Sequence, residues 1–238
     1  MLDICLLGTG GMMPMPSRFL TAMLARLNGR LALIDCGEGP QVTMKMLGWG
    51  FKAIDVICFT HFHADHISGL PGLLLTIGNA GRTEPLTLIG PVGLQRIVEG
   101  LTLIAPELPF PIEYIELTQD APNPISVGAF EIHHCPADHM VKCFAYRIDL
   151  KRKGKFDVKK AERLKLPKPL WNKLQKEGSV EHEGKTYTAD MVMGENRKGI
   201  SVAYGTDSRP VDRSTKVVEG VQLFICEGMC GEEEKKQK

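Results

Sequence analysis

Short apolar runs alternate with polar and Gly/Pro-rich segments along the first half of the chain. Four runs are rich in aliphatic, often branched side chains and predict buried strands: residues 2–7, 31–35, 54–59 and 86–89. Three further segments predict helices: residues 41–47, 70–77 and 91–103. The first helix is expected to end at Gly48, and the last places Ile97, Val98 and Leu101 on one face. This alternation of short strands and helices predicts an α/β sandwich.

Side chains that can bind metal follow directly behind the apolar run at 54–59. Three histidines and an aspartate fall within six positions there: His61, His63, Asp65 and His66. Side chains two apart on an extended segment point the same way, so His61 and His63 can converge on one cation. Asp65 and His66 could face a second. Imidazole and carboxylate suit zinc, with iron or manganese as alternatives. A single histidine is more often an ordinary core or surface residue, but the four residues together favour a two-metal site.

Two later segments could complete this site. The first, residues 131–139, ends an apparent strand and offers four candidates: His133, His134, Asp138 and His139. In the second, residues 202–209, a strand ends at Asp207, whose two carboxylate oxygens could each bind one metal. A strand-end aspartate is more often a turn residue, but beside the histidine cluster we expect Asp207 to bridge two cations.

The segments around the first two strands carry weaker signals. Asp35 ends the second predicted strand, where it could orient metal ligands or cap a helix that begins near Pro40. Both interpretations stay open. The Gly-rich segment 8–18 lacks the lysine and the spacing of a phosphate-binding Walker motif, so we expect it to form a tight turn.

Composition is that of a globular protein with one substantial core. The chain has 238 residues, 43% hydrophobic and 24% charged, and no linker-like segment divides it, so we expect a single domain over residues 1–238. No apolar run could span a bilayer and no secretory signal is evident, which favours the cytoplasm and no membrane partner. The seven cysteines lack C-x-x-C spacing and are expected to be free thiols.

Five segments, taken in order, resemble a known family. They are LGTGGMMPMPSR, LIDCGEGPQ, THFHADHISGLPGLL, the stretch from Ala137 to Arg147, and DSRP from Asp207 to Pro210. Together they resemble ribonuclease Z, a family of the metallo-β-lactamase fold; DCGEG with HADHISGLPGLL favours this family over its relatives. The resemblance implies a four-layer αββα sandwich of two mixed sheets between helices. It also implies a zinc-dependent endonuclease that cleaves the 3′ trailer from precursor tRNA, acting as a homodimer.

The resemblance also implies a role for each candidate ligand. His61, His63 and His139 would hold one zinc ion, Asp65 and His66 a second, and Asp207 would bridge the two. His139 is preferred over His133 and His134 because its distance to the segment 144–147 matches the family pattern. The implied reaction is two-metal phosphodiester hydrolysis, in which Asp65 also orients or deprotonates the nucleophile.

Two departures from the family pattern concern the C-terminal part. Many members carry a histidine just before a late glutamate, where it can protonate the leaving oxygen, but here Cys226 precedes Glu227. A last zinc-binding histidine normally follows, yet no histidine occurs after His182 and the chain ends in GEEEKKQK. We therefore expect that a C-terminal part is missing from this sequence. If the chain as given were complete, the second metal site would be one ligand short and metal affinity would be weaker.

Basic charge is concentrated in one segment. Residues 151–176 contain eleven Lys/Arg against two acidic residues, a local charge of +9 in a chain whose net charge is +1. By the resemblance, a flexible arm that grips tRNA lies here, as an insertion at about 150–195. Six residues are candidates for phosphate contacts: Lys151, Arg152, Lys153, Lys155, Lys159 and Lys160. A solvated helix face is the alternative. Trp171 or Tyr187 could stack on a base or pack the arm against the body.

Two other functions stay in play. One is a hydrolase of the same fold that acts on a small phosphodiester such as a cyclic nucleotide, which would have no use for the basic segment. The other is a metal-binding or RNA-binding relative without turnover, which Cys226 and the missing histidine motivate. Metal stoichiometry separates the second from the enzymes, because one zinc per chain would favour it.

Overall fold

The computed structural model describes residues 1–13, 15–105, 107–152, 154–195, 197–209 and 217–227. Within these ranges the chain forms two units. The main unit comprises Met1–Asp149 with the described residues from Ser201 onward, and the inserted unit comprises Leu150–Ile200. None of the helices in the described ranges is long and apolar enough to cross a membrane.

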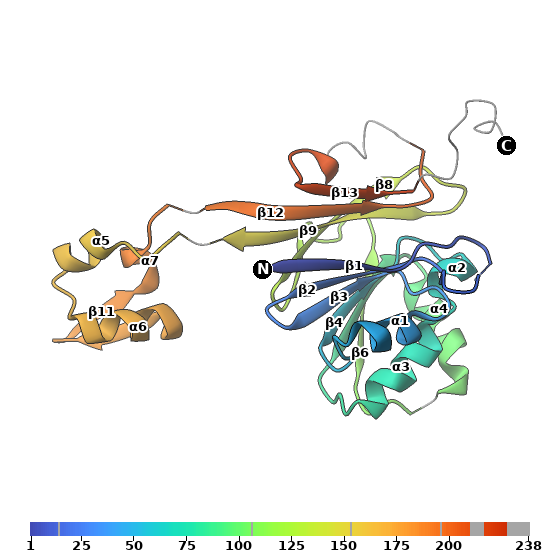
Figure 1. The fold of residues 1–238 in the computed structure, drawn as a ribbon, viewed down its shortest axis with the longest axis horizontal. Coiled ribbons are helices and arrows are strands. Elements are labelled where there is room, and N and C mark those ends of the chain that lie inside the picture. The colour runs from blue at the N-terminus through green and yellow to red at the C-terminus, as the bar shows by residue number, and fades with distance from the viewer. Residues whose placement is uncertain (14, 106, 153, 196, 210–216, 228–238) are drawn as a thin grey trace. The chain divides into compact units, whose positions relative to one another are not determined.

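A six-stranded sheet carries the first half of the main unit (Figure 1). Its strands, in spatial order, are β1 (Leu2–Gly8), β2 (Ala22–Leu27), β3 (Arg30–Ile34), β4 (Ile54–Cys58), β5 (Leu86–Pro91) and β6 (Ile112–Leu117). The pairs β1–β2 and β2–β3 are antiparallel, whereas the three pairs from β3 to β6 are parallel. Parallel strands need crossover connections, and helices supply them here. These helices are α1 (Pro40–Leu47), α2 (Ala64–Ile67), α3 (Leu70–Asn79) and α4 (Leu94–Leu101), the last followed by the 3-10 turn η1 (Thr102–Ile104).

Apolar side chains of this sheet and its helices form the largest core cluster in the described residues. Leu33 and Ile57 from the sheet pack in one cluster with Leu73 and Leu74 of α3 and Leu94 of α4, all fully buried. Burying each such side chain contributes roughly 1.5–3 kcal/mol before the entropy of ordering it is counted. The core therefore fixes where β4 ends, which is where the histidine cluster begins.

The second sheet is also mixed. Its spatial order is β13 (Leu223–Cys226), β12 (Arg197–Gly205), β9 (Cys143–Arg152), β8 (Phe130–Ala137) and β7 (Ile125–Val127). Strands β7, β8 and β9 pair antiparallel, and β12 pairs parallel to β13. The Tyr146 hydroxyl donates to the Phe59 carbonyl at 2.7 Å and the Phe144 N–H donates to the Thr60 carbonyl at 2.9 Å, which ties β9 to the segment after β4. The expected α/β class with two mixed sheets and flanking helices is confirmed.

The inserted unit has a small core of its own. It contains α5 (Val158–Arg163), α6 (Lys168–Glu177), the hairpin β10 (Ser179–His182) and β11 (Lys185–Thr188), and α7 (Ala189–Val192). Asp157 caps α5 by accepting the Lys160 N–H at 3.2 Å. The Trp171 indole donates to the Leu166 carbonyl at 2.8 Å and packs against Phe156. Trp171 therefore packs within this unit.

One predicted helix begins later than the apolar spacing suggested. The segment 91–103 was expected to be helical from its first residue, but Pro91 is the last residue of β5 and α4 begins at Leu94. Gly93 precedes the helix with φ of 98°, a left-handed conformation that turns the chain out of the strand. Helices α1 and α3 occupy the predicted segments, and α1 ends at Gly48 as expected.

Candidate metal centre

Four side chains from three separate loops converge where β4, β8 and β12 end. The donor atoms of His61, His63, His139 and Asp207 all lie within 4.8 Å of one another. His63 Nδ1 is 3.0 Å from His61 Nε2 and 3.3 Å from His139 Nε2. Asp207 Oδ2 is 3.4 Å from His61 Nε2. Three imidazole nitrogens and one carboxylate oxygen at this spacing make a donor set that suits zinc.

A second group of donors shares the same aspartate. His66 Nε2 lies 3.1 Å from Asp207 Oδ2 and 3.8 Å from Asp65 Oδ2. Asp207 Oδ2 is therefore within 3.4 Å of a nitrogen of His61 and also close to one of His66. This is the placement that a carboxylate needs in order to face two cations at once. All six predicted ligands are gathered in one place.

Asp35 fixes the orientation of His66 from behind. Its Oδ2 lies 2.8 Å from His66 Nδ1, and its Oδ1 accepts the Thr60 N–H at 2.8 Å. The Thr60 hydroxyl also donates to this carboxylate, and all three side chains are buried. Because this carboxylate accepts the proton on Nδ1, Nε2 is the nitrogen that faces Asp65 and Asp207 and that would give its lone pair to a metal ion. Of the two roles open for Asp35, orientation fits the structure, since Gly39 occupies the N-cap of α1.

Close backbone packing sets the position of α2, which carries Asp65 and His66. The Cys36 N–H donates to the His66 carbonyl at 2.7 Å, and the Gly69 N–H donates to the Cys36 carbonyl at 2.9 Å. A Cβ atom on Gly37 would lie 2.3 Å from the Asp65 carbonyl oxygen, so only glycine fits there. The DCGEG segment thus holds the metal-binding helix by direct backbone contact.

The carboxylates give the site a strong preference for positive charge. Burial alone would lower the pKa of His66, but hydrogen bonds with Asp207 and Asp35 outweigh it and raise that pKa to about 10. At His61, burial and then the charge of His66 lower the pKa to about 3, so this ring is neutral and keeps a lone pair. Neutral imidazole is the form that binds metal. The carboxylates around His66 favour added positive charge, and the neutral His61 offers a lone pair. Together these features suit a divalent cation.

Glu227 holds Asp207 from its backbone side. The Asp207 N–H donates to Glu227 Oε2 at 2.7 Å, and Asp207 has a φ of 48°, in the left-handed region that non-glycine residues rarely adopt. A second hydrogen bond, between the carboxyl groups of Asp207 and Glu227, followed by burial, raises the pKa of Glu227 to about 7, although the backbone N–H alone would lower it. Glu227 therefore stabilises the unusual turn that presents the Asp207 carboxylate.

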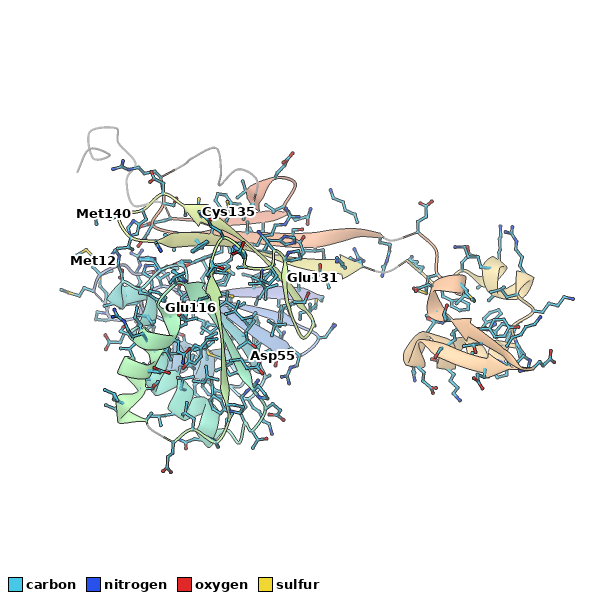
Figure 2. All side chains as sticks on the ribbon, turned by 180° about the vertical axis from the view of Figure 1, so that it is seen from behind. Met12, Asp55, Glu116, Glu131, Cys135 and Met140 are labelled. Carbon is cyan, nitrogen blue, oxygen red and sulfur yellow. The ribbon has the colours of Figure 1, made fainter. Side chains whose placement is uncertain are left out.

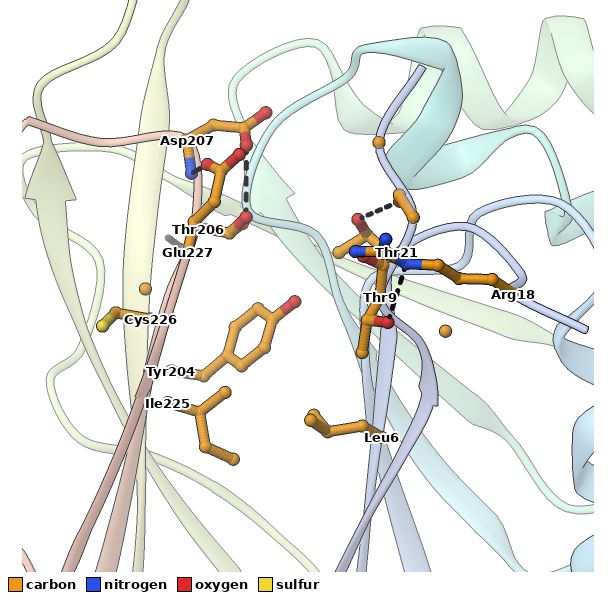
Figure 3. Close-up of a pocket in the computed structure, with 14 residues that line it drawn as sticks. Leu6, Thr9, Arg18, Thr21, Tyr204, Thr206, Asp207, Ile225, Cys226 and Glu227 are labelled. Atoms are coloured by element: carbon orange, nitrogen blue, oxygen red, sulfur yellow. Dashed lines mark hydrogen bonds between the residues drawn. The ribbon is translucent and has the colours of Figure 1, made fainter. Parts of the chain in front are cut away.

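A pocket of about 260 Å³ opens beside Asp207 and Glu227 (Figure 3). Residues of the segment after β1, among them Thr9 and Arg18, line the opposite wall. The Arg18 guanidinium donates to the Thr9 carbonyl at 2.8 Å, which keeps it on that wall. The pocket leaves room for part of a substrate next to the carboxylate shared by both groups of donors.

Other predicted candidates lie outside this cluster. His133 Nε2 is 3.3 Å from Asp149, and His134 Nε2 is 3.2 Å from the Pro122 carbonyl, so the contacts of both rings are structural. The Asp138 N–H donates to the Ser208 hydroxyl at 3.1 Å. Pro210 of the DSRP segment and residues 228–238 lie outside the described residues.

The basic residues of the inserted unit that were predicted to contact phosphates differ in solvent exposure. Lys151, Arg152, Lys155 and Lys159 are exposed, and Lys153 lies outside the described residues. The Lys160 ammonium donates to the Met193 carbonyl at 2.7 Å and is half-buried, so part of its hydrogen-bonding capacity is used within the unit.

Two contributors to the site were not foreseen from the sequence. Thr60 supports Asp35, and its position directly before the first histidine is a usable signal. The Met12 N–H donates to Asp65 Oδ2 at 2.9 Å. A backbone donor leaves no trace in residue identity, so nothing in the sequence could have identified Met12.

Solved structures share this architecture. The long form of RNase Z from yeast aligns with a TM-score of 0.62 at 15% identity, covering 95% of this chain and 32% of that one. Human tRNase Z, short form, aligns with a TM-score of 0.54 at 29% identity, covering 62% of this chain and 64% of that one. With the cluster of histidines and aspartates, the two mixed sheets between helices define a hydrolase of the metallo-β-lactamase fold.

Comparison with known sequences identifies the family within this fold class. The chain is 56% identical over 235 residues to ribonuclease Z of Agathobacter rectalis, covering 99% of this chain and 77% of that protein. The chain belongs to the ribonuclease Z family. A protein-family model described as Anti-Pycsar protein Apyc1 also matches residues 2–98.

Proposed function

We propose that this chain is an endonuclease that cleaves the 3′ trailer from precursor tRNA. The observation that carries the proposal is the convergence of all six predicted ligands, with Asp207 Oδ2 close to both His61 and His66, in a chain of the ribonuclease Z family. The exposed basic residues of the inserted unit support a polyanionic substrate.

We propose two zinc ions as the resident metals. His61, His63 and His139 would hold one ion, Asp65 and His66 the other, and Asp207 would bridge them. The donor atoms fit this assignment because imidazole nitrogens and carboxylate oxygens converge within a few ångströms of one another. When bound, the two ions supply Lewis acidity that lowers the pKa of water and neutralises charge developing on the phosphate.

Asp65 is the residue we assign to the nucleophile. Its Oδ2 accepts the Met12 N–H at 2.9 Å, which fixes the carboxylate in the mouth of the site. From there Asp65 can orient the attacking water and accept its proton. His66 is fixed by Asp35 behind it, so neither side chain has to reorganise when a phosphodiester enters.

We also propose that the inserted unit is the arm that binds tRNA away from the site. Lys151, Arg152, Lys155 and Lys159 are exposed and able to reach phosphates, and Lys153 and Lys160 complete the candidate set. A homodimer is proposed from the family resemblance alone. A cytoplasmic location is proposed as well, supported by the six free cysteines of the described residues.

The test is to incubate the zinc-loaded chain with a precursor tRNA that carries a 3′ trailer and to map the product ends. We expect cleavage next to the tRNA body, and a loss of about a thousandfold or more in the His63→Ala variant. Metal content should be two zinc ions per chain. Hydrolysis of a cyclic nucleotide without cleavage of the precursor would overturn the proposal in favour of a small phosphodiester, and one zinc per chain without turnover would favour a binding protein.

A further inference from the structure

Exposed methionines surround the metal centre. Met12 and Met13 precede it on the segment after β1, and Met140 directly follows His139. Their side chains are 88%, 71% and 90% exposed. Figure 2 shows Met12 and Met140 at the same end of the main unit. Large apolar side chains this exposed are costly to hydrate, and beside a functional site they indicate a surface that a partner covers.

The segment that carries Met12 is held in place. The Met12 N–H donates to Asp65 Oδ2 at 2.9 Å, and Met12 has a φ of 57°. The Met13 N–H donates to the Gly11 carbonyl at 2.7 Å, and Met15 pairs with Arg18. Left-handed backbone at a non-glycine residue is strained, so the bond to Asp65 helps to keep Met12 there. The backbone thereby presents the Met12 side chain next to a proposed metal ligand.

Met140 directly follows a histidine of the same donor set. His139 Nε2 lies 3.3 Å from His63 Nδ1, and His139 is one residue from Met140. Val141 beside it is 41% exposed. Exposed apolar side chains therefore belong to two segments that take part in the site, one through the hydrogen bond to Asp65 and the other through His139.

We propose that Met12, Met13 and Met140 form an apolar rim that contacts the nucleobases on either side of the scissile phosphate. The proposal rests on the proposed function, and it adds which side chains contact the bases next to the cleaved bond. Methionine is unbranched and polarizable, and its sulfur makes favourable contacts with aromatic rings, so it adapts to different base faces. Contact with a base face does not depend on base identity, unlike hydrogen bonding to base edges.

A second copy of the chain is the competing occupant of this surface. A stable interface takes roughly 20–30 residues on each side. The rim offers three methionines and Val141, and it borders the metal centre, which a second copy would block. The size and the position of the rim therefore favour single nucleotides over a subunit.

The test combines a double variant with a modified substrate. Met12→Gln/Met140→Gln keeps side-chain length and the Met12 N–H but removes the apolar surface. The matched control is Met46→Gln, since Met46 is 80% exposed on α1 and contacts none of the proposed ligands in the described interactions. The substrates are a precursor tRNA and the same RNA with abasic nucleotides on both sides of the cleavage position.

We expect the double variant to lose roughly five- to twentyfold in kcat/KM on the normal precursor, and Met46→Gln to lose less than twofold. On the abasic precursor, kcat/KM of the wild type should fall by a similar factor. For the double variant it should fall by almost nothing more, because both changes remove the same interaction. Zinc content should be equal in all variants. The rim proposal would be overturned if the losses from the double substitution and from the abasic nucleotides multiplied. It would also be overturned if the double variant were as active as the wild type. A change in oligomeric state in the double variant would overturn it as well.

Binding separates this inference from the proposed function. The same substitutions on a His63→Ala background are titrated with a fluorescently labelled single-stranded RNA, normal or abasic at two positions. If the wild type cleaves no precursor, the proposed function fails. The rim is then still tested by binding: Met12→Gln/Met140→Gln should weaken binding of the normal RNA and leave binding of the abasic RNA unchanged. Equal binding of both RNAs by every variant would reject the rim whatever the cleavage result.

Discussion

The buried carboxylate of Asp35 decides which nitrogen of His66 faces the metal centre. It lies 2.8 Å from Nδ1 and takes two further hydrogen bonds from Thr60, so its own position is fixed. Partners of this kind, which hold a metal-binding histidine from behind, commonly change metal affinity by 10- to 100-fold when they are removed. Asp35 touches no substrate, yet it controls whether His66 can act as a ligand.

Replacing Asp35 with asparagine should weaken zinc binding by about 10- to 100-fold while the fold persists. The amide oxygen can still accept from Thr60, but the NH2 group then faces His66 Nδ1 and favours the tautomer with its proton on Nε2. Competition with a chromophoric chelator would measure the zinc affinity, and far-ultraviolet circular dichroism the fold. Unchanged affinity in a folded Asp35→Asn protein would show that the carboxylate does not set the tautomer.

Glu227 acts on Asp207 through a backbone hydrogen bond, and this gives a prediction that distinguishes two substitutions. Glu227→Gln keeps an oxygen that can accept the Asp207 N–H, so we expect activity and zinc affinity within about threefold of the wild type. Glu227→Ala removes the acceptor from a strained turn with φ of 48° and should weaken zinc binding at least tenfold. Metal titration of both variants is the measurement. Equal losses in the two would mean that the negative charge matters, and that the acceptor does not.

At the level of helices and strands, sequence patterns predicted most of what surrounds the metal centre. The runs at 31–35 and 54–59 form β3 and β4, and the cluster behind them is local enough to be recognised directly. Strand β2, although nearly fully buried, was not predicted as a separate element because its apolar residues follow a Gly/Pro-rich turn without clear alternation. Contacts between segments far apart in the sequence were the hardest to predict. Asp35 and His66 are 31 positions apart, and Met12 reaches Asp65 through its backbone.

Glycine at position 37 provides a test of how α2 is held. A Cβ atom there would lie 2.3 Å from the Asp65 carbonyl and 2.6 Å from Leu20 Cβ, so Gly37→Ala should push Asp65 out of place. Overpacking of this kind costs typically 1–3 kcal/mol, and we expect zinc affinity to fall at least tenfold as well. Thermal unfolding and metal titration measure the two effects.

The control for this substitution is Gly81→Ala. Gly81 has a φ of 78° and open space where the methyl group of an alanine would lie, so the cost there is backbone strain of about 1 kcal/mol without any effect on zinc affinity. If Gly37→Ala behaved like Gly81→Ala, the close contact with Asp65 would not be what positions the helix.

Across the whole molecule, charge is strongly segregated. Residues 151–176 carry +9 within a chain of net charge +1. Double substitution of Lys155 and Lys159 by glutamine should therefore weaken precursor binding and reduce the slope of log affinity against log salt by about 1.4 to 1.8, since each phosphate contact contributes roughly 0.7 to 0.9. Lys45→Gln on α1 is the control and should leave the slope unchanged. An unchanged slope in the double variant would show that these lysines form a solvated surface and make no phosphate contacts.

The inserted unit leaves the main unit through β9 and returns through β12, and these two strands are neighbours in one sheet. The ends of the insertion are therefore brought together by sheet pairing, whatever the insertion contains. Evolution can lengthen, shorten or exchange such a cassette without moving His139 or Asp207, which lie at the other ends of the same two strands. With the inserted unit as the proposed tRNA-binding arm, substrate binding and bond cleavage would be separable traits, the first carried by the insertion and the second by the main unit.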